Sequence, residues 1–376
     1  MEKSIIGERL KEVREARKMS QEELSHRVGI TRASISAYEK GFKYPSFQKL
    51  EQLSIELMIP IVYLQNERPI RSNRIGLLSY LKKARASQAI QNQMSRFEEW
   101  LDDVYSVYSN YIDFPELNFL SSKLIDYENL PDVEVEKIAE DLRIQWGMGL
   151  GPIDNLLDFV EANGIVVGRA VLDSDVEAVS VWRSQRPQIL INKTIKACVR
   201  VRMSTAHELG HLVLHRLVNE EDYEDEKKYA LMERQASFFA GCFLFPRQSF
   251  FNEFCSTRID ALLALKKRWK LSMGAIVMRA KNLEIINDNN VKAFYKQLNA
   301  RGYSRNKEPL DDKIPIEPIK LFSEAVEILL ENRINLQRII DETLLSSNDF
   351  YTITDIEPIV NKEKNVKILQ FRRIVE

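Results

Sequence analysis

The segment His207-Glu208-Leu209-Gly210-His211 constrains this chain more than any other part of its sequence. In an α-helix, two histidines four residues apart lie on one face, about 6 Å apart along the axis, so both imidazoles can bind one zinc ion. Glu208 is then placed to act as a general base toward water beside that ion. The chain has four histidines, and three of them lie between positions 207 and 215. We therefore predict a zinc-binding helix here.

His215, the third histidine of this cluster, does not fit the same ion. In a straight helix it lies about 12 Å along the axis from His207, and zinc–nitrogen bonds are only about 2 Å long. The three-histidine pattern HExxHxxGxxH is also absent, because positions 214 and 217 are both leucine. We expect His215 to pack beside the site, and it becomes a ligand only if the helix breaks before it.

The helix expected from about Lys227 to Phe243 offers a third ligand. It carries Glu233 and, further along, Ala236 and Ala240, whose small side chains allow close packing against the histidine helix. The acidic run at 220–226 offers other carboxylates, but flexible surface acids seldom form an ordered metal site, and we interpret this run as a solvated loop. Glu233 is therefore the favoured third ligand.

Together these two helices resemble a known family. The segments RVRMSTAHELGHLVLH and ERQASFFAGCFLFP look like those of the ImmA/IrrE zinc metallopeptidases, and the similarity extends over about residues 130–290. The resemblance implies a zincin-like fold with His207, His211 and Glu233 as zinc ligands and Glu208 as catalytic base. Ser237 stands where the family often has asparagine. The group that stabilises the oxyanion stays open between Tyr223 and Tyr229, on position alone.

The N-terminal residues follow the pattern of a helix-turn-helix. Ser20 comes just before a run of apolar residues at helical spacing, and Glu23 lies three residues after Ser20. This pair has the pattern of a capping box at the start of a helix. Gly29 suits the tight turn, and Thr31 can cap a second helix that would enter the major groove. The segment SQEELSHRVGITRASISAYEKG thus predicts a DNA-binding unit.

Residues 5 to 65 resemble the Cro/C1-type (Xre) helix-turn-helix family at nearly every framework position. The resemblance implies a five-helix domain that binds double-stranded operator DNA as a homodimer. It places one set of residues nearest the bases, namely Arg32, Ala33, Ser36 and Ala37, and another nearest the phosphates, namely Gln21, Thr31 and Lys43. Residues 1–65 contain 11 Lys or Arg against 9 Asp or Glu, so we expect modest affinity unless the protein dimerises.

Composition limits the remaining possibilities. The 376 residues, 44% hydrophobic and 29% charged, are typical of a globular protein with two or three domains. The formal net charge of -1 provides no global basic field, so a DNA-binding surface must be local. The sequence shows no signal peptide and no apolar run of membrane-spanning length, which predicts a cytoplasmic protein. Three widely spaced cysteines predict neither disulfides nor a cysteine zinc site.

The periodicity predicts a mainly α protein with a small β-sheet, an α+β fold. Strand-like segments occur at 165–169, 176–182 and 187–192, where β-branched residues lie between turn-forming residues. We predict four parts. They are a helix-turn-helix domain (1–65), a helical linker (66–115), a metallopeptidase domain (116–290) and a helical C-terminal region of unassigned role (291–376).

The linker carries an excess of positive charge. Between 66 and 90 it has one acidic residue, Glu67, and six basic ones: Arg68, Arg71, Arg74, Lys82, Lys83 and Arg85. A solvated helix face is the simpler interpretation, and phosphate contact is the alternative.

Both resemblances in one chain point to the fused Xre and ImmA/IrrE regulators. Their stand-alone peptidases cut a Cro/C1-type repressor, which implies a DNA-binding transcriptional regulator with zinc metalloendopeptidase activity. Its protein substrate would be a helix-turn-helix repressor, an antitoxin, or its own linker, and no membrane is involved. Two alternatives stay open: a regulator whose peptidase-like domain is a non-catalytic sensor, and a toxin-antitoxin component.

Overall fold

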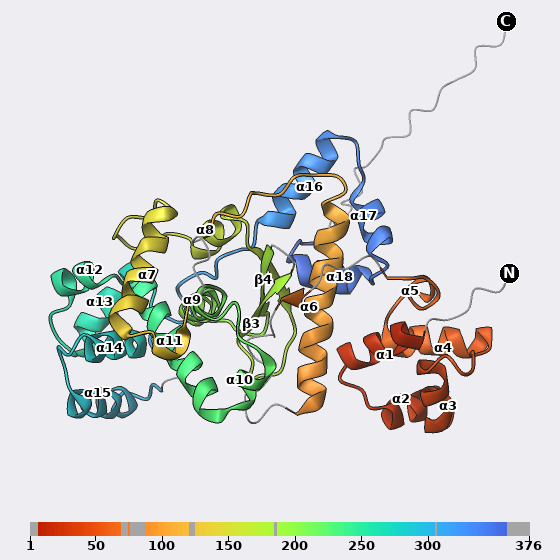
Figure 1. The fold of residues 1–376 in the computed structure, drawn as a ribbon, viewed down its shortest axis with the longest axis horizontal. Coiled ribbons are helices and arrows are strands. Elements are labelled where there is room, and N and C mark those ends of the chain that lie inside the picture. The colour runs from red at the N-terminus through yellow and green to blue at the C-terminus, as the bar shows by residue number, and fades with distance from the viewer. Residues whose placement is uncertain are drawn as a thin grey trace, which may run out of the picture.

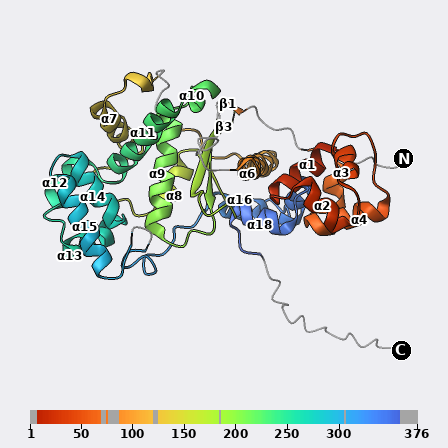
Figure 2. The same ribbon diagram turned by 90° about the horizontal axis from the view of Figure 1, so that it is seen from below.

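The computed structural model describes residues 7–68, 74–75, 87–119, 125–183, 186–304 and 307–358. Along its longest axis the helix-turn-helix lies at one end and a group of helices, α12 to α15, lies at the other (Figure 1). Between them lie α6 with the C-terminal helices, a small sheet, and the pair α9 and α11, and the view from below shows the same order (Figure 2). The predicted mainly α fold with a small sheet is confirmed.

The N-terminal domain has the five predicted helices, α1 (Gly7–Ala16), α2 (Gln21–Val28), α3 (Arg32–Glu39), α4 (Phe47–Leu57) and α5 (Ile61–Gln65). Ser20 caps α2 by accepting a hydrogen bond from the backbone of Glu23 at 3.0 Å. Gly29 ends that helix with a φ of 65°, in the left-handed region that glycine adopts without strain. Thr31 caps α3 through the backbone N–H of Ser34. The predicted cap and turn residues are confirmed.

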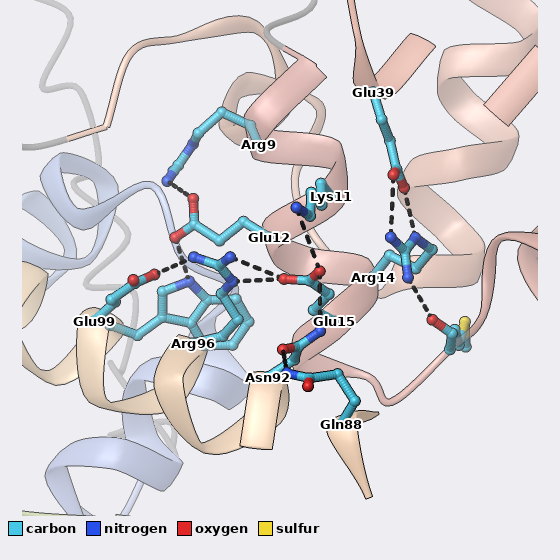
Figure 3. Close-up of polar contacts among 12 residues, drawn as sticks. Arg9, Lys11, Glu12, Arg14, Glu15, Glu39, Gln88, Asn92, Arg96 and Glu99 are labelled. Carbon is cyan, nitrogen blue, oxygen red and sulfur yellow. Dashed lines mark hydrogen bonds and ion pairs between the residues drawn. The ribbon is translucent and has the colours of Figure 1, made fainter. Parts of the chain in front are cut away.

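Helix α6 (Gln88–Tyr108) is a central layer of the molecule. A continuous apolar core runs from the N-terminal domain through this helix to one face of the sheet and to the C-terminal helices. Figure 3 shows the polar contacts beside that core, where Arg96 of α6 binds Glu15 of α1 and Glu99. The indole of Trp100 donates to Glu12 and to the hydroxyl of Tyr63. The N-terminal domain is therefore packed firmly on α6.

The remainder of the predicted linker is only partly described. Residues 69–73 and 76–86 lie outside the described residues, and of Arg74 only the backbone is described. Most of the basic run predicted there, Arg71, Lys82, Lys83 and Arg85, therefore lies outside the described chain. The domain boundaries stay predictions.

The sheet separates two cores. Its strands are β1 (Arg74–Ile75), β2 (Val166–Ala170), β3 (Ala178–Arg183) and β4 (Arg186–Asn192), in the order β1-β3-β4-β2. Strand β4 pairs with β3 antiparallel and with β2 parallel. Along β3, Val179 and Val181 face α6, whereas Ala178 and Trp182 join the core on the opposite side. Alternate residues of one strand thus bind two different helical layers.

The second core holds most of the remaining helices, with α9 and α11 at its centre (Figure 1). They are α7 (Asp132–Gln145), α8 (Leu156–Ala162), α9 (Cys198–Leu214), α11 (Glu226–Leu244), α12 (Arg247–Glu253), α13 (Ile259–Trp269), α14 (Met273–Asn282) and α15 (Asp288–Ala300). The short helix α10 (Glu220–Glu224) joins a small separate cluster through Tyr223. A 3-10 turn, η1 (Tyr127–Asn129), precedes α7. None of the helices in the described part of the chain is both long enough and apolar enough to cross a membrane.

The C-terminal helices are α16 (Leu321–Glu331), α17 (Leu336–Thr343) and α18 (Ser347–Thr354). They pack back on α6 and the sheet, as both views show (Figures 1 and 2). Asp349 of α18 forms a two-bonded ion pair with Arg17, and Asp355 binds Arg169 of β2. These helices therefore connect the N-terminal domain to the sheet, a role that the sequence did not indicate.

Candidate metal centre

The candidate metal centre lies where α9 and α11 pack against each other. Three ligand atoms converge there from His207, His211 and Glu233, all within 4.8 Å of one another. The Nε2 atoms of the histidines are 3.1 Å apart, and the Glu233 oxygens lie 3.5 Å from His207 Nε2 and 3.3 Å from His211 Nε2. Tetrahedral zinc with bonds of about 2.05 Å separates its ligand atoms by about 3.3 Å. The three side chains therefore fit one zinc ion.

The centre is open to solvent on one side. The His211 side chain is 3% exposed, whereas the side chains of His207 and Glu233 are 20% and 30% exposed. Burial alone would raise the pKa of the Glu233 carboxyl, but the contacts of its oxygens with His207 and His211 outweigh it and hold that pKa well below its usual range. Glu233 is therefore an ionised carboxylate, the state that a metal ligand requires.

Glu208 is held in place by the sheet. It is buried, and its Oε2 accepts a hydrogen bond of 2.7 Å from the Ser180 hydroxyl on β3. This contact fixes the carboxylate between α9 and β3. Sequence reasoning missed Ser180. It lies two residues before Trp182 on β3, so both side chains point to the strand face toward α9, and this spacing offered a signal.

His215 lies behind His211. Helix α9 ends at Leu214, and His215 is its C-cap, with its Nδ1 3.0 Å from His211 Nδ1. Its Nε2 lies 3.1 Å from Gln235 Oε1, and Gln235 Nε2 donates to the carbonyl oxygen of Tyr127 at 2.7 Å. Burial and then the neighbouring His211 lower the pKa of His215 to about 3, so the imidazole is neutral. The geometry agrees with the expectation that His215 packs beside the site.

Sequence reasoning also missed Gln235 and the Tyr127 carbonyl. Gln235 is fully buried on an otherwise apolar face of α11. A polar residue at such a position is a weak sequence signal that its side chain has a buried hydrogen-bond partner. A backbone carbonyl carries no signal at all. Ser237, noted in the sequence, places its hydroxyl 3.2 Å from His207 Nδ1.

One of the two tyrosines considered for oxyanion stabilisation lies close to the site. Tyr223 is buried, and its pKa is raised first by that burial and then by the charges of Glu208 and Glu233. Tyr229 is partly buried and packs in the same small apolar cluster as Tyr223. The charges of Glu208 and Glu233 act on Tyr223, which makes it the candidate donor to an oxyanion.

The acidic run at 220–226 is ordered differently from the predicted solvated loop. It forms the short helix α10, with a capping box between Asn219 and Asp222, and then the start of α11. Asp222 binds Lys228, and Asp225 caps α11 through two backbone N–H groups. The loop prediction was wrong because these carboxylates find local capping partners.

The predicted DNA-contact residues lie at the start of α2, at the start and along α3, and in the segment after α3. Thr31, Arg32, Ala33 and Lys43 are exposed, and Ser36 and Ala37 on the same helix are half-buried. Gln21 is half-buried as well, and its amide donates to Glu39 at 2.8 Å. The same Glu39 carboxylate forms an ion pair with Arg14, which anchors the end of α3 to α1 (Figure 3). Helix α3 therefore presents its first turns to solvent on a rigid support.

Comparisons with known proteins match two separate segments of this chain. A helix-turn-helix family model matches residues 10–64, and the peptidase M78 model, described as the IrrE N-terminal-like domain, matches residues 160–281. The uncharacterized HTH-type transcriptional regulator YqaE of Bacillus subtilis (strain 168) is 33% identical over 60 residues, which is 16% of this chain. The chain spans about half the length of that relative, 52%.

A solved structure of Bacillus thuringiensis PlcR in complex with the peptide PapR7 and DNA is 14% identical to this chain. The match covers 92% of this chain and 93% of that one with a TM-score of 0.15, which supports no conclusion about a shared fold. The two family matches are local, and each covers less than half of the chain. This chain therefore joins a segment that matches the helix-turn-helix family model to a segment that matches the IrrE N-terminal-like domain of peptidase M78.

Proposed function

We propose that this protein is a cytoplasmic transcriptional regulator that is also a zinc metalloendopeptidase. Its substrate is a partner helix-turn-helix repressor or antitoxin, or its own segment between residues 66 and 115. The observation that carries the proposal is the convergence of His207, His211 and Glu233 from two helices. Glu208 follows His207 on the same helix and is held by Ser180.

The proposed chemistry divides between the ion and the chain. Zinc in such a site polarises the scissile carbonyl and activates water. Glu208 takes the proton of the attacking water and returns it to the leaving amine. Ser180 holds one oxygen of that carboxylate, and Tyr223 is the proposed donor to the developing oxyanion.

The proposed DNA contacts come from the exposed start of α3. Arg32, Ala33, Ser36 and Ala37 would meet base edges, and Gln21, Thr31 and Lys43 would meet phosphates. Lys43→Ala should weaken binding to all sequences alike and reduce the slope of log affinity against log salt by about 0.9, whereas Arg32→Ala should reduce discrimination between sites. Equal losses of Arg32→Ala on operator and unrelated DNA would contradict the assignment of Arg32 to the bases.

A homodimer is part of the proposal. Ile55, Met58 and Val62 are 72%, 64% and 48% exposed on neighbouring turns of α4 and α5. Exposed apolar side chains on a small domain support a contact with a second copy, because the domain's own net charge is too small for strong DNA binding by one copy. Light scattering on the wild type and on Ile55→Asp tests this: a dimer that becomes a monomer is the expected result.

The decisive test of proteolysis is Glu208→Gln in living cells. New protein N-termini in cells that express the wild type should vanish in Glu208→Gln, with zinc content and operator binding unchanged. Glu221→Gln, a nearby residue on α10, is the matched control and should cleave normally. If the biological response persists in Glu208→Gln, the proteolytic proposal fails and a non-catalytic sensor becomes the better account. The identity of the cleaved protein separates a repressor from an antitoxin.

A further inference from the structure

A chain of four buried groups stands behind one candidate zinc ligand. His211 contacts His215 through their Nδ1 atoms at 3.0 Å, His215 Nε2 contacts Gln235 Oε1 at 3.1 Å, and Gln235 Nε2 contacts the Tyr127 carbonyl at 2.7 Å. The residues His211 and His215 are each 4% exposed, and Gln235 is 0% exposed. We call these groups the buried hydrogen-bond chain.

The Tyr127 carbonyl, at the far end of the buried hydrogen-bond chain, determines which atom donates and which accepts in each of its hydrogen bonds. A carbonyl oxygen only accepts, so Gln235 must present its amide nitrogen to Tyr127 and its oxygen to His215. The Gln235 oxygen cannot donate, and therefore His215 Nε2 carries the proton. A neutral imidazole has one donor and one acceptor, so His215 Nδ1 is an acceptor. The proton between the two histidines then belongs to His211 Nδ1.

This assignment has a direct consequence for metal binding. With its proton on Nδ1, His211 has a lone pair on Nε2, which is the atom 3.3 Å from Glu233 and 3.1 Å from His207 Nε2. The opposite tautomer would place a proton where the ion belongs. We propose that His215 and Gln235 are positioning residues that lock His211 in the Nδ1-protonated tautomer before metal arrives, and this proposal rests on the zinc site of the proposed function.

The two histidine ligands are supported unequally. His207 Nδ1 faces the Ser237 hydroxyl at 3.2 Å in an exposed setting, and a hydroxyl can donate or accept, so it selects no tautomer. His211 is held by partners that leave it one tautomer. The inferred order is therefore that His211 is organised in advance, whereas His207 adapts when the ion binds.

The first measurement is the tautomer of His211 in metal-free, full-length wild type, read from imidazole nitrogen and carbon-bound proton correlations in NMR spectra. The proposal expects a proton on Nδ1 and none on Nε2. A predominantly Nε2-protonated His211 overturns it. This result does not depend on zinc binding or peptidase activity, so it is separable from the proposed function.

The second measurement is zinc affinity by competition with a chromophoric chelator. His215→Leu and Gln235→Leu should weaken zinc binding by about 10- to 100-fold and mix the two His211 tautomers. His215→Asn offers an acceptor near the Nδ1 position and should recover most of the affinity. Thr205→Val removes another fully buried polar group from α9, the Thr205 hydroxyl, and is the control for general disruption.

The outcomes separate the two claims. If wild type binds zinc but His215→Leu and Gln235→Leu bind it as tightly, the positioning proposal fails and the zinc site stands. Equal losses in Thr205→Val and His215→Leu would likewise contradict positioning, because they would reflect disturbed packing alone. If wild type binds no zinc, the proposed function fails, and the tautomer measurement still decides whether the buried chain selects one form of His211.

Discussion

Gly210 and Ala236 touch where α9 crosses α11. A Cβ placed on Gly210 would lie 3.1 Å from both the Cα and the carbonyl oxygen of Ala236, closer than a Cβ ordinarily approaches a neighbouring atom. The two helices are therefore as near as their backbones allow. Glu233 lies three residues before Ala236, so this close approach brings its carboxylate oxygens within 3.5 Å of both histidines.

Gly210→Ala should lower zinc affinity with little effect on stability. Alanine favours a helix over glycine by about 1 kcal/mol, which offsets the strain against Ala236. The added methyl group pushes α11 away by a few tenths of an ångström, and we expect zinc to bind about tenfold more weakly, or about 1.4 kcal/mol. Chelator competition and thermal unfolding measure the two effects. Gly151→Ala, whose Cβ meets nothing within 4 Å, should change neither. Unaltered zinc affinity in Gly210→Ala would contradict this account.

Much of the candidate site could be predicted from local sequence. Helical spacing fixes which face carries His207 and His211, and the small residues of the second helix indicate close packing, so Glu233 followed from neighbouring residues. Ser180 and Gln235 were missed because their partners come from elements brought together only by the fold.

The layer formed by α6 could not be foreseen for a similar reason. Glu98 and Asp102 look like a solvated helix face in the sequence, yet both are 1% exposed. Glu98 binds Arg183 of β3 at 2.5 and 2.7 Å, and Asp102 accepts from Gln188 of β4. Charges that pair across layers are buried with their partners, which a pattern of apolar spacing cannot register.

Ser180→Ala should impair cleavage without releasing the metal. Loss of the hydroxyl removes the 2.7 Å bond to Glu208, so the carboxylate is no longer fixed for proton transfer. We expect the rate of appearance of new N-termini to fall by about tenfold or more, with zinc content unchanged. Ser204→Ala is the matched control. Ser204 lies on the same helix as Glu208, and its hydroxyl also donates to a carboxylate, that of Glu177. Equal rates of cleavage for wild type and Ser180→Ala would contradict the positioning role of Ser180.

The ion pair between Arg17 and Asp349 should hold the N-terminal domain on the C-terminal helices. Its two bonds measure 2.9 and 2.7 Å, and the side chains are 11% and 6% exposed. Arg17→Met should lower the free energy of unfolding by about 3 kcal/mol, because Asp349 stays buried without its positively charged partner. Urea unfolding measures the loss, and limited proteolysis should show faster cleavage between the domains.

The neighbouring pair of Lys18 and Asp173 is the control for that prediction. Its side chains are 35% and 22% exposed, so Lys18→Met should change stability by about 1 kcal/mol at most. A double-mutant cycle of Arg17→Met with Asp349→Asn isolates the pair itself. A coupling energy near zero would show that the contact does not fix the domain.

Glu161 should make stability depend on pH. Burial raises its pKa from 4.5 to about 8, against the backbone N–H bonds from Lys320 and Leu321 that lower it. Between pH 4.5 and 8 the folded protein keeps this proton and the unfolded chain releases it, so the unfolding free energy falls as pH rises, by at most about 1.4 kcal/mol per unit. Glu161→Gln should therefore gain stability over wild type across this window and match it below pH 4.5. Parallel stability profiles for the two proteins would refute the shift.

The central claim is that His207, His211 and Glu233 bind one zinc ion, and zinc content per chain tests it most directly. Elemental analysis is made on wild type and Glu233→Ala purified without added metal, with Glu221→Ala as a surface control. We predict about one zinc in wild type and in Glu221→Ala, and a large loss in Glu233→Ala. Wild type that holds no zinc even after zinc is supplied, or Glu233→Ala that holds as much as wild type, would contradict the account.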